Sequence, residues 1–364
     1  VALSDEYITQ SFNPAREAAW NKMQEPGMEK IKKKHNLMSL VIFLLPIAVT
    51  IICIGIGRYH ISPLESLQIL VSPLTGQEVD PQGWSVVYHV RLPRIMLALV
   101  AGMGLSISGA SFQALFSNPL ATPDTLGVAT GASFGAVLAL LFTRNVFVVQ
   151  LAALAMGLAA LAGTCMISRL NGKSSILMVV LGGMVVSSLF QALVSLVKYV
   201  ADPDEDLPAI TYWLMGSMSR ATYQGLAVGI PLILLGVALL FLLRWRLNIL
   251  SLQEDETRAL GIDVRKLRIM VMAASTLVTA SCVSLCGQVG WVGLLIPHVA
   301  RMLYGSDNRK IIPVSMGLGS AFMVVIDTAS RAATAAEIPV SILTAIIGAP
   351  FFIILLRRTG GARL

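Results

Sequence analysis

The chain has 364 residues, of which 55% are hydrophobic and 13% are charged, and its formal net charge is +7. Soluble domains carry roughly 25% charged residues, so the composition excludes an ordinary soluble protein. The basic residues lie in short clusters between long apolar runs. That distribution is typical of membrane topology signals and argues against a nucleic-acid partner.

The first 36 residues are polar, and we interpret them as a cytoplasmic N-terminal tail. A basic cluster of Lys30, Lys32, Lys33 and Lys34 comes directly before the first apolar run. Contact with lipid headgroups is one interpretation of this cluster, but we favour a plain topology signal. The first apolar run is long enough to span a bilayer, so we expect no cleavable signal peptide.

Ten apolar runs follow, and a membrane-spanning helix needs about 20 residues. The sequence therefore predicts an all-α polytopic membrane protein with a permease domain at 37–358 and a cytoplasmic tail at 359–364. With both termini in the cytoplasm, 20 of the 27 Lys and Arg residues lie inside, as expected. The eighth run is short and contains Pro297, so we expect it to be broken or reentrant. The predicted spans are 37–57, 92–111, 124–143, 146–168, 175–198, 225–244, 267–286, 290–304, 311–329 and 338–356.

Three segments between the spans are longer than turns. Residues 58–90 and 199–224 lie outside, and the first contains a short amphipathic stretch at 64–71. The acidic run 202–206 is more typical of a solvated loop than of a metal-capturing site, because prolines interrupt it. Residues 245–266 lie inside, are polar and helix-prone, and are suited to docking a soluble partner. Spans two to five and seven to ten suggest an inverted repeat, an arrangement common in transporters.

Signals for catalysis are poor. Gly172-Lys173-Ser174 resembles the end of a phosphate-binding loop, but position 167 is Ile where that loop requires Gly. The four cysteines fall in apolar runs and are interpreted as buried thiols. We predict no catalytic residue, no cofactor and no metal site. Asp327 and Arg331, the ionisable pair nearest mid-membrane, are four residues apart on one helix face and are predicted to pair.

Ionisable groups within the spans are few, which argues against a proton-coupled secondary carrier. It also argues against a carrier of bare metal ions. Energy is therefore expected from another subunit. Small residues are dense in two spans, where they either pack helices closely or line a wide pathway. They are Gly102, Gly104, Ser106, Ser108, Gly109, Ala110, Gly127, Gly131, Ser133 and Gly135.

Several long stretches resemble the FecCD family of ABC-transporter permeases, which includes permeases for cobalamin, haem and ferric siderophores. They are RLPR at 91–94, SGASFQALFSNPLATPDTLG at 108–127, LPAITYWLMGSMS at 207–219, ALGIDVRKLR at 259–268, GQVGWVGLLIPHVAR at 287–301 and IPVSILTAIIGAPFFIILL at 338–356. The resemblance covers nearly everything after residue 36. It implies a BtuC-like fold (type II ABC importer) of ten transmembrane helices that pairs with a second copy around the translocation pathway.

The resemblance also implies partners. Two ATP-binding subunits would dock at the cytoplasmic face on the coupling segment 248–264, with ATP hydrolysed by those subunits. A substrate-binding protein would dock outside on the residues that match the family's docking arginines, Arg91, Arg94 and Arg331. The cytoplasmic gate would include Asn118, Leu120, Ser174 and Ser175. The coupling residues would be Leu252, Glu254, Arg258, Ala259, Leu260 and Gly261.

We therefore expect a non-enzymatic permease subunit in a prokaryotic inner membrane, carrying a bulky metal chelate, a ferric siderophore or haem. Cobalamin is the alternative substrate, and other family members carry oxyanions. Two other classes compete with this interpretation. A secondary carrier would transport without an ATPase, and a membrane enzyme would require a cluster of polar catalytic residues at one membrane face.

Overall fold

The computed structural model describes residues 37–168, 176–251 and 263–359. By its internal contacts the chain divides into two units, residues 1–44 and 45–364. The described part of the first unit, residues 37–44, is helical throughout. The contacts discussed below belong to the second unit, and the two predicted tails lie, but for Thr359, outside the described residues.

In the described ranges, seven helices are long and apolar enough to cross a membrane, and three shorter apolar helices accompany them. Each of the ten matches one predicted span, so the predicted all-α polytopic fold is confirmed. The long helices are Leu37–Gly55, Pro81–Leu115, Val146–Ser168, Leu177–Val200, Tyr223–Leu250, Val264–Cys286 and Asn308–Ala333; the short ones are Val128–Leu140, Val292–Tyr304 and Val340–Ile354.

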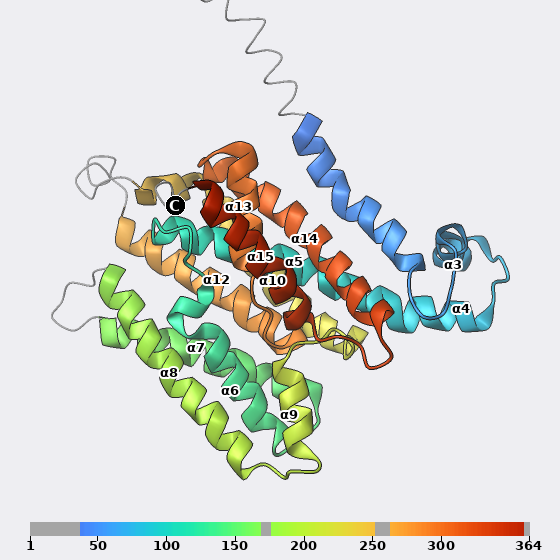
Figure 1. The fold of residues 1–364 in the computed structure, drawn as a ribbon, viewed down its shortest axis with the longest axis horizontal. Helices are drawn as coiled ribbons and strands as arrows, with labels where there is room; N and C mark the ends of the chain where they lie inside the picture. Colours follow the sequence, from blue (N-terminus) through green and yellow to red (C-terminus); the bar gives the residue numbers. More distant parts are fainter. Residues whose placement is uncertain (1–36, 169–175, 252–262, 360–364) are drawn as a thin grey trace, which may run out of the picture. The chain divides into compact units, whose positions relative to one another are not determined.

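The labels in Figure 1 divide these helices more finely. The elements are α3 (Pro63–Thr75), α4 (Pro81–Ser85), η1 (Val86–Arg91), α5 (Leu92–Leu115), η2 (Pro123–Leu126), α6 (Val128–Leu140), α7 (Val146–Ser168), α8 (Ile176–Val200), α9 (Asp206–Leu214), α10 (Tyr223–Leu247), η3 (Asn248–Ser251), α12 (Val264–Cys286), α13 (Val292–Tyr304), α14 (Asn308–Ala333) and α15 (Val340–Thr359).

The second span begins earlier than the sequence predicted. Asp80 caps the start of α4 by accepting a hydrogen bond of 2.7 Å from the Gly83 N–H, and Pro81 occupies the first helical position. The helix then continues through the π-helical turn η1 into α5. Proline is favoured at the first position of a helix, and Pro81 and likewise Pro63 begin helices in the predicted outer segment 58–90. Arg91 and Arg94 consequently lie within a helix.

Helix α5 is the centre of one helical group, in which it packs against α10, α13 and α14 (Figure 1). Two glycine contacts set the close approach of these helices. A Cβ on Gly102 would lie 2.2 Å from the Gly319 carbonyl oxygen of α14, and one on Gly109 would lie 1.9 Å from the Gly293 carbonyl oxygen of α13. The small residues of the predicted second span from Gly102 to Ala110 are buried within the chain, so helix packing explains them.

Helices α6, α7 and α8 form a second group, and α12 packs against members of both. Here too a small residue sets the spacing, since a Cβ on Gly135 would lie 2.2 Å from the Ala152 carbonyl oxygen of α7. The predicted eighth span is short, as expected: α13 has 13 residues with Pro297 inside it. It follows Trp291, whose φ of 69° is left-handed.

Candidate functional site

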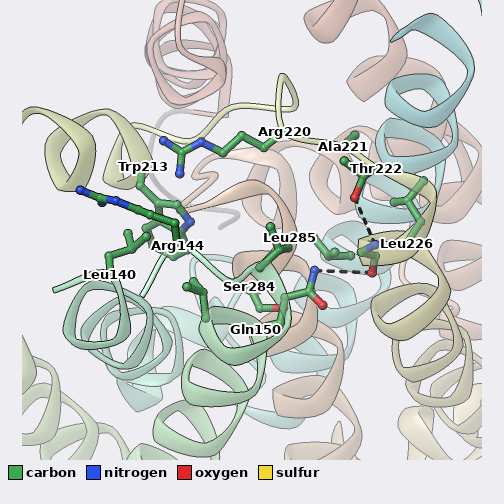
Figure 2. A pocket seen from close by; sticks show the side chains of 13 residues that line it. Leu140, Arg144, Gln150, Trp213, Arg220, Ala221, Thr222, Leu226, Ser284 and Leu285 are labelled. Atoms are coloured by element: carbon green, nitrogen blue, oxygen red, sulfur yellow. Dashed lines mark hydrogen bonds between the residues drawn. The ribbon is translucent and has the colours of Figure 1, made fainter. Parts of the chain in front are cut away.

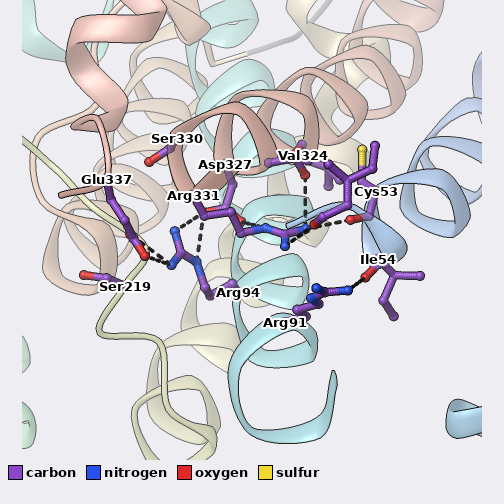
Figure 3. Close-up of polar contacts among 12 residues, drawn as sticks. Cys53, Ile54, Arg91, Arg94, Ser219, Val324, Asp327, Ser330, Arg331 and Glu337 are labelled. Carbon is purple, nitrogen blue, oxygen red and sulfur yellow. Dashed lines mark hydrogen bonds and ion pairs between the residues drawn. The ribbon is translucent and has the colours of Figure 1, made fainter. Parts of the chain in front are cut away.

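The candidate site is a cluster of charged side chains where the start of α5 meets the end of α14 (Figure 3). Arg91 and Arg94 come from η1 and α5, and Asp327 and Arg331 come from α14. Glu337 joins them from the segment between α14 and α15. By the predicted topology this cluster lies at the outer ends of the spans.

Arg94 is held between two carboxylates. Its Nε and Nη2 donate to Asp327 Oδ1 at 3.1 and 2.8 Å, and its Nη1 donates to both oxygens of Glu337 at 2.9 and 3.0 Å. The Arg94 and Asp327 side chains are 3% and 1% exposed, whereas Glu337 is 26% exposed. Charge-assisted pairs of this kind are strong and directional, so Arg94 fixes α5 against α14.

Arg91 and Arg331 bind main-chain oxygens at the end of the Leu37–Gly55 helix. Arg91 Nη1 donates to the Ile54 and Gly55 carbonyls at 2.6 and 3.1 Å, and Arg331 Nη2 donates to the Cys53 carbonyl at 2.6 Å. Additional donations go to the Tyr59 and Ile56 carbonyls. The last carbonyls of a helix have no hydrogen-bond donors within the helix. The guanidinium groups of Arg91 and Arg331 supply those donors.

Gly57 makes room for both guanidiniums, because a Cβ there would lie 2.9 Å from an Nη atom of Arg91 and of Arg331. The predicted pair of Asp327 and Arg331 is present, with Arg331 Nε 3.6 Å from Asp327 Oδ2. The three arginines predicted for docking are thus brought together, but all three are buried. They face two carboxylates, so the cluster of five carries a formal charge of +1.

The inner end of α5 carries the predicted gate residues. The Asn118 side chain accepts a hydrogen bond of 2.9 Å from the Leu120 N–H, and its backbone carbonyl accepts one of 3.1 Å from Ala121. This turn leaves Leu120 45% exposed. Ser174 and Ser175, the other two gate candidates, lie outside the described residues, so the four are not brought together here.

The six predicted coupling residues, 252–261, also lie outside the described residues. The part before them is anchored to α14. Asn248 donates to Asp307 Oδ1 at 2.8 Å and accepts from the Asn308 N–H at 2.9 Å. Partial burial alone would raise the pKa of Asp307, but hydrogen bonds from Asn248 and Arg309 hold it below its usual range.

Two contacts made by α5 were not predicted from the sequence. One is Glu337, whose partnership with Arg94 spans 243 positions and follows no periodic spacing. The other joins Arg301 of α13 to Gln113 of α5, where the arginine donates to the amide oxygen while the amide nitrogen lies 3.4 Å from the Gly293 carbonyl. In both cases the sequence offered a charged residue near a span end but no indication of its partner.

A depression near the predicted outer ends of α7, α10 and α12 encloses about 480 Å³ of empty space, part of it open to solvent (Figure 2). Arg144, Gln150, Trp213 and Arg220 line it. Arg144 is paired with Asp206 at 2.6 Å, and the Gln150 amide nitrogen lies 3.5 Å from the Gly225 carbonyl. Within the described ranges, no group of three His, Cys, Asp or Glu side chains is arranged to hold a metal ion.

The ten apolar helices, together with a superposition on a solved ABC transporter at 39% identity, define a polytopic membrane permease of the ABC-transporter class. The chain belongs to the FecCD transport family, whose model matches residues 44–358. Permeases of this family are multi-span proteins of the prokaryotic inner membrane and transport subunits rather than enzymes.

Named relatives differ in substrate. A molybdate import system permease protein of Haemophilus influenzae is 42% identical over 315 residues, covering 86% of this chain and 94% of that protein. A cobalamin import system permease protein of Halobacterium salinarum is 39% identical over 273 residues, covering 75% and 73%. A solved structure described as an inward-facing metal-chelate type ABC transporter superposes with a TM-score of 0.81 at 39% identity, covering 89% and 99%.

Proposed function

We propose that the protein is the permease subunit of a binding-protein-dependent, ATP-driven importer, and that two copies enclose the pathway for an intact metal chelate, a ferric siderophore or haem. The observation that carries this proposal is the charged cluster of Arg91, Arg94, Arg331, Asp327 and Glu337 in a chain of the FecCD family. Its excess positive charge suits an acidic partner at the outer face.

The outer partner in this proposal is a substrate-binding protein that presents carboxylates to the cluster. Arg94 is the most suitable recipient, since the carboxylate on its outer edge, Glu337, is partly exposed. Arg91 and Arg331 are committed to the carbonyls at the end of the first helix, so their part is to shape the docking surface and supply charge. Charges at such a surface set encounter rate and register more than affinity.

At the cytoplasmic face, two ATP-binding subunits dock on the segment 248–264 and hydrolyse ATP, and both termini lie on that side. The anchoring of Asn248 to Asp307 supports this role, because a force on the segment is transmitted to α14. The α14 helix carries Asp327 and Arg331 at its other end. Asn118, Leu120, Ser174 and Ser175 form the inner gate in this proposal.

The chelate remains the first substrate candidate, with cobalamin as the alternative supported by the Halobacterium salinarum relative. A second class, an oxyanion, is favoured by the molybdate permease relative, which matches over 94% of its length. The discriminating experiment is a binding screen of the importer's own binding protein against ferric siderophores, haem, cobalamin and molybdate. Tight binding of molybdate alone would overturn the chelate proposal.

A further inference from the structure

Glu337 lies in the short connection between α14 and α15, and its backbone is left-handed with φ of 52°. This conformation is strained for a residue that carries a Cβ. The connection is held in this shape by Ser330, whose hydroxyl donates to the Ile338 carbonyl at 2.6 Å and whose carbonyl accepts from the Ile338 N–H at 3.2 Å. These contacts place the Glu337 carboxylate against Arg94.

The two carboxylates on Arg94 are not equivalent. The Asp327 side chain is 1% exposed and belongs to a helix. The Glu337 side chain is 26% exposed and belongs to the connection after α14, in which residues 334–336 are exposed. Withdrawing Asp327 would require α14 to move. Withdrawing Glu337 requires only a side-chain rotation or a change in a strained connection. Arg94 thus has one fixed carboxylate partner, Asp327, and one replaceable carboxylate partner, Glu337, on its more exposed side.

We propose that Glu337 is an internal competitor of the docking partner: it occupies the outer edge of Arg94 in the undocked permease, and a carboxylate of the partner replaces it on docking. This inference rests on the proposed docking role of Arg94. The exchange trades one charge-assisted pair for another. Docking therefore gains less from Arg94 than it would from an uncovered arginine, which keeps the complex readily reversible.

A second cation lies on the predicted outer side. It is Arg220, which lines the depression of Figure 2. Arg220 is exposed and makes no ion pair or hydrogen bond among the residues described in the structure. An approaching acidic surface therefore also meets the exposed positive charge of Arg220 on the predicted outer side, before any exchange occurs.

The test measures binding of the importer's own binding protein to the permease and its ATPase in nanodiscs. Glu337→Gln removes the competing charge while keeping the shape of the side chain, and it is expected to tighten Kd about 5–10-fold at low salt. It should also steepen the salt dependence, because the cluster charge rises by one. Glu337→Ala should change Kd in the same direction. Glu78→Gln, an exposed outer acid, is the matched control and should leave Kd unchanged.

A second variant separates the two proposals. Arg94→Met removes the receiving cation and should weaken binding. If Arg94→Met weakens binding while the Glu337 variants leave Kd unchanged or raise it, the competitor role is overturned and the docking role stands. If Arg94→Met leaves Kd unchanged in folded protein, the docking role itself fails, and the competitor inference fails with it.

Discussion

Asp327 lies 233 positions after Arg94 in the chain, yet its Oδ1 is 2.8 Å from Arg94 Nη2, and both side chains are almost fully buried. The pair joins α5 to α14 near one end of their shared interface. Because neither charge has access to bulk water, each depends on partners inside the protein for neutralisation: Arg94 on Asp327 and Glu337, and Asp327 on Arg94 and Arg331. This dependence makes the pair sensitive to the loss of either partner.

Asp327→Asn should destabilise the permease strongly. Removing one partner of a buried ion pair costs about 3–5 kcal/mol, and here three buried arginines would be left with Glu337 as the one carboxylate of the described cluster. Thermal unfolding in detergent provides the measurement. Asp206→Asn is the matched control, since its partner Arg144 is 53% exposed and such surface pairs contribute about 1 kcal/mol or less. Equal melting points for the two variants would contradict the structural account.

Gly109→Ala should prevent close packing of α5 against α13. The added Cβ would lie 1.9 Å from the Gly293 carbonyl oxygen, a main-chain atom that cannot move without displacing its helix. We expect a large loss of monodisperse protein in size-exclusion chromatography. Gly290→Ala is the control, because nothing lies within 4 Å of its added Cβ. A Gly109→Ala variant as stable as Gly290→Ala would show that the two helices are not in contact.

The spans were predictable because apolar runs of the required length are a local property of the sequence. The starts of helices were less predictable. The second span was predicted to begin at residue 92, whereas its helix begins at Pro81, capped by Asp80. The partners of the arginines could not be predicted beyond the pair of Asp327 and Arg331. Glu337 reaches Arg94 through the tertiary arrangement of α5 and α14, which no sequence spacing encodes.

Arg331→Met should loosen the end of the first helix. The variant loses the hydrogen bonds from Arg331 to the Cys53 and Ile56 carbonyls. Those carbonyls must then be hydrated, and the end of the helix frays. Hydrogen–deuterium exchange should accelerate at residues 55–60. Arg58→Met is the control, because Arg58 is exposed and donates instead to the Thr334 carbonyl at 2.7 Å. Unchanged exchange in Arg331→Met would refute the capping role.

Single cysteines at positions 78 and 255 should label from opposite sides of the membrane. Glu78 is exposed in the predicted outer segment, and position 255 belongs to the predicted inner coupling segment. The background requires Cys165→Ser, because the other three native cysteines are buried and Cys165 is only partly so. Labelling of both positions from the same side by an impermeant maleimide would contradict the topology.

ATP-driven import that depends on a binding protein can be measured as uptake into proteoliposomes that contain the permease and its ATPase, with the binding protein and a radiolabelled substrate added outside. We predict uptake only when ATP is enclosed and the binding protein is present, and its loss when residues 253–259 are deleted. Uptake by the permease alone, without ATP or either partner, would contradict the account and identify a secondary carrier.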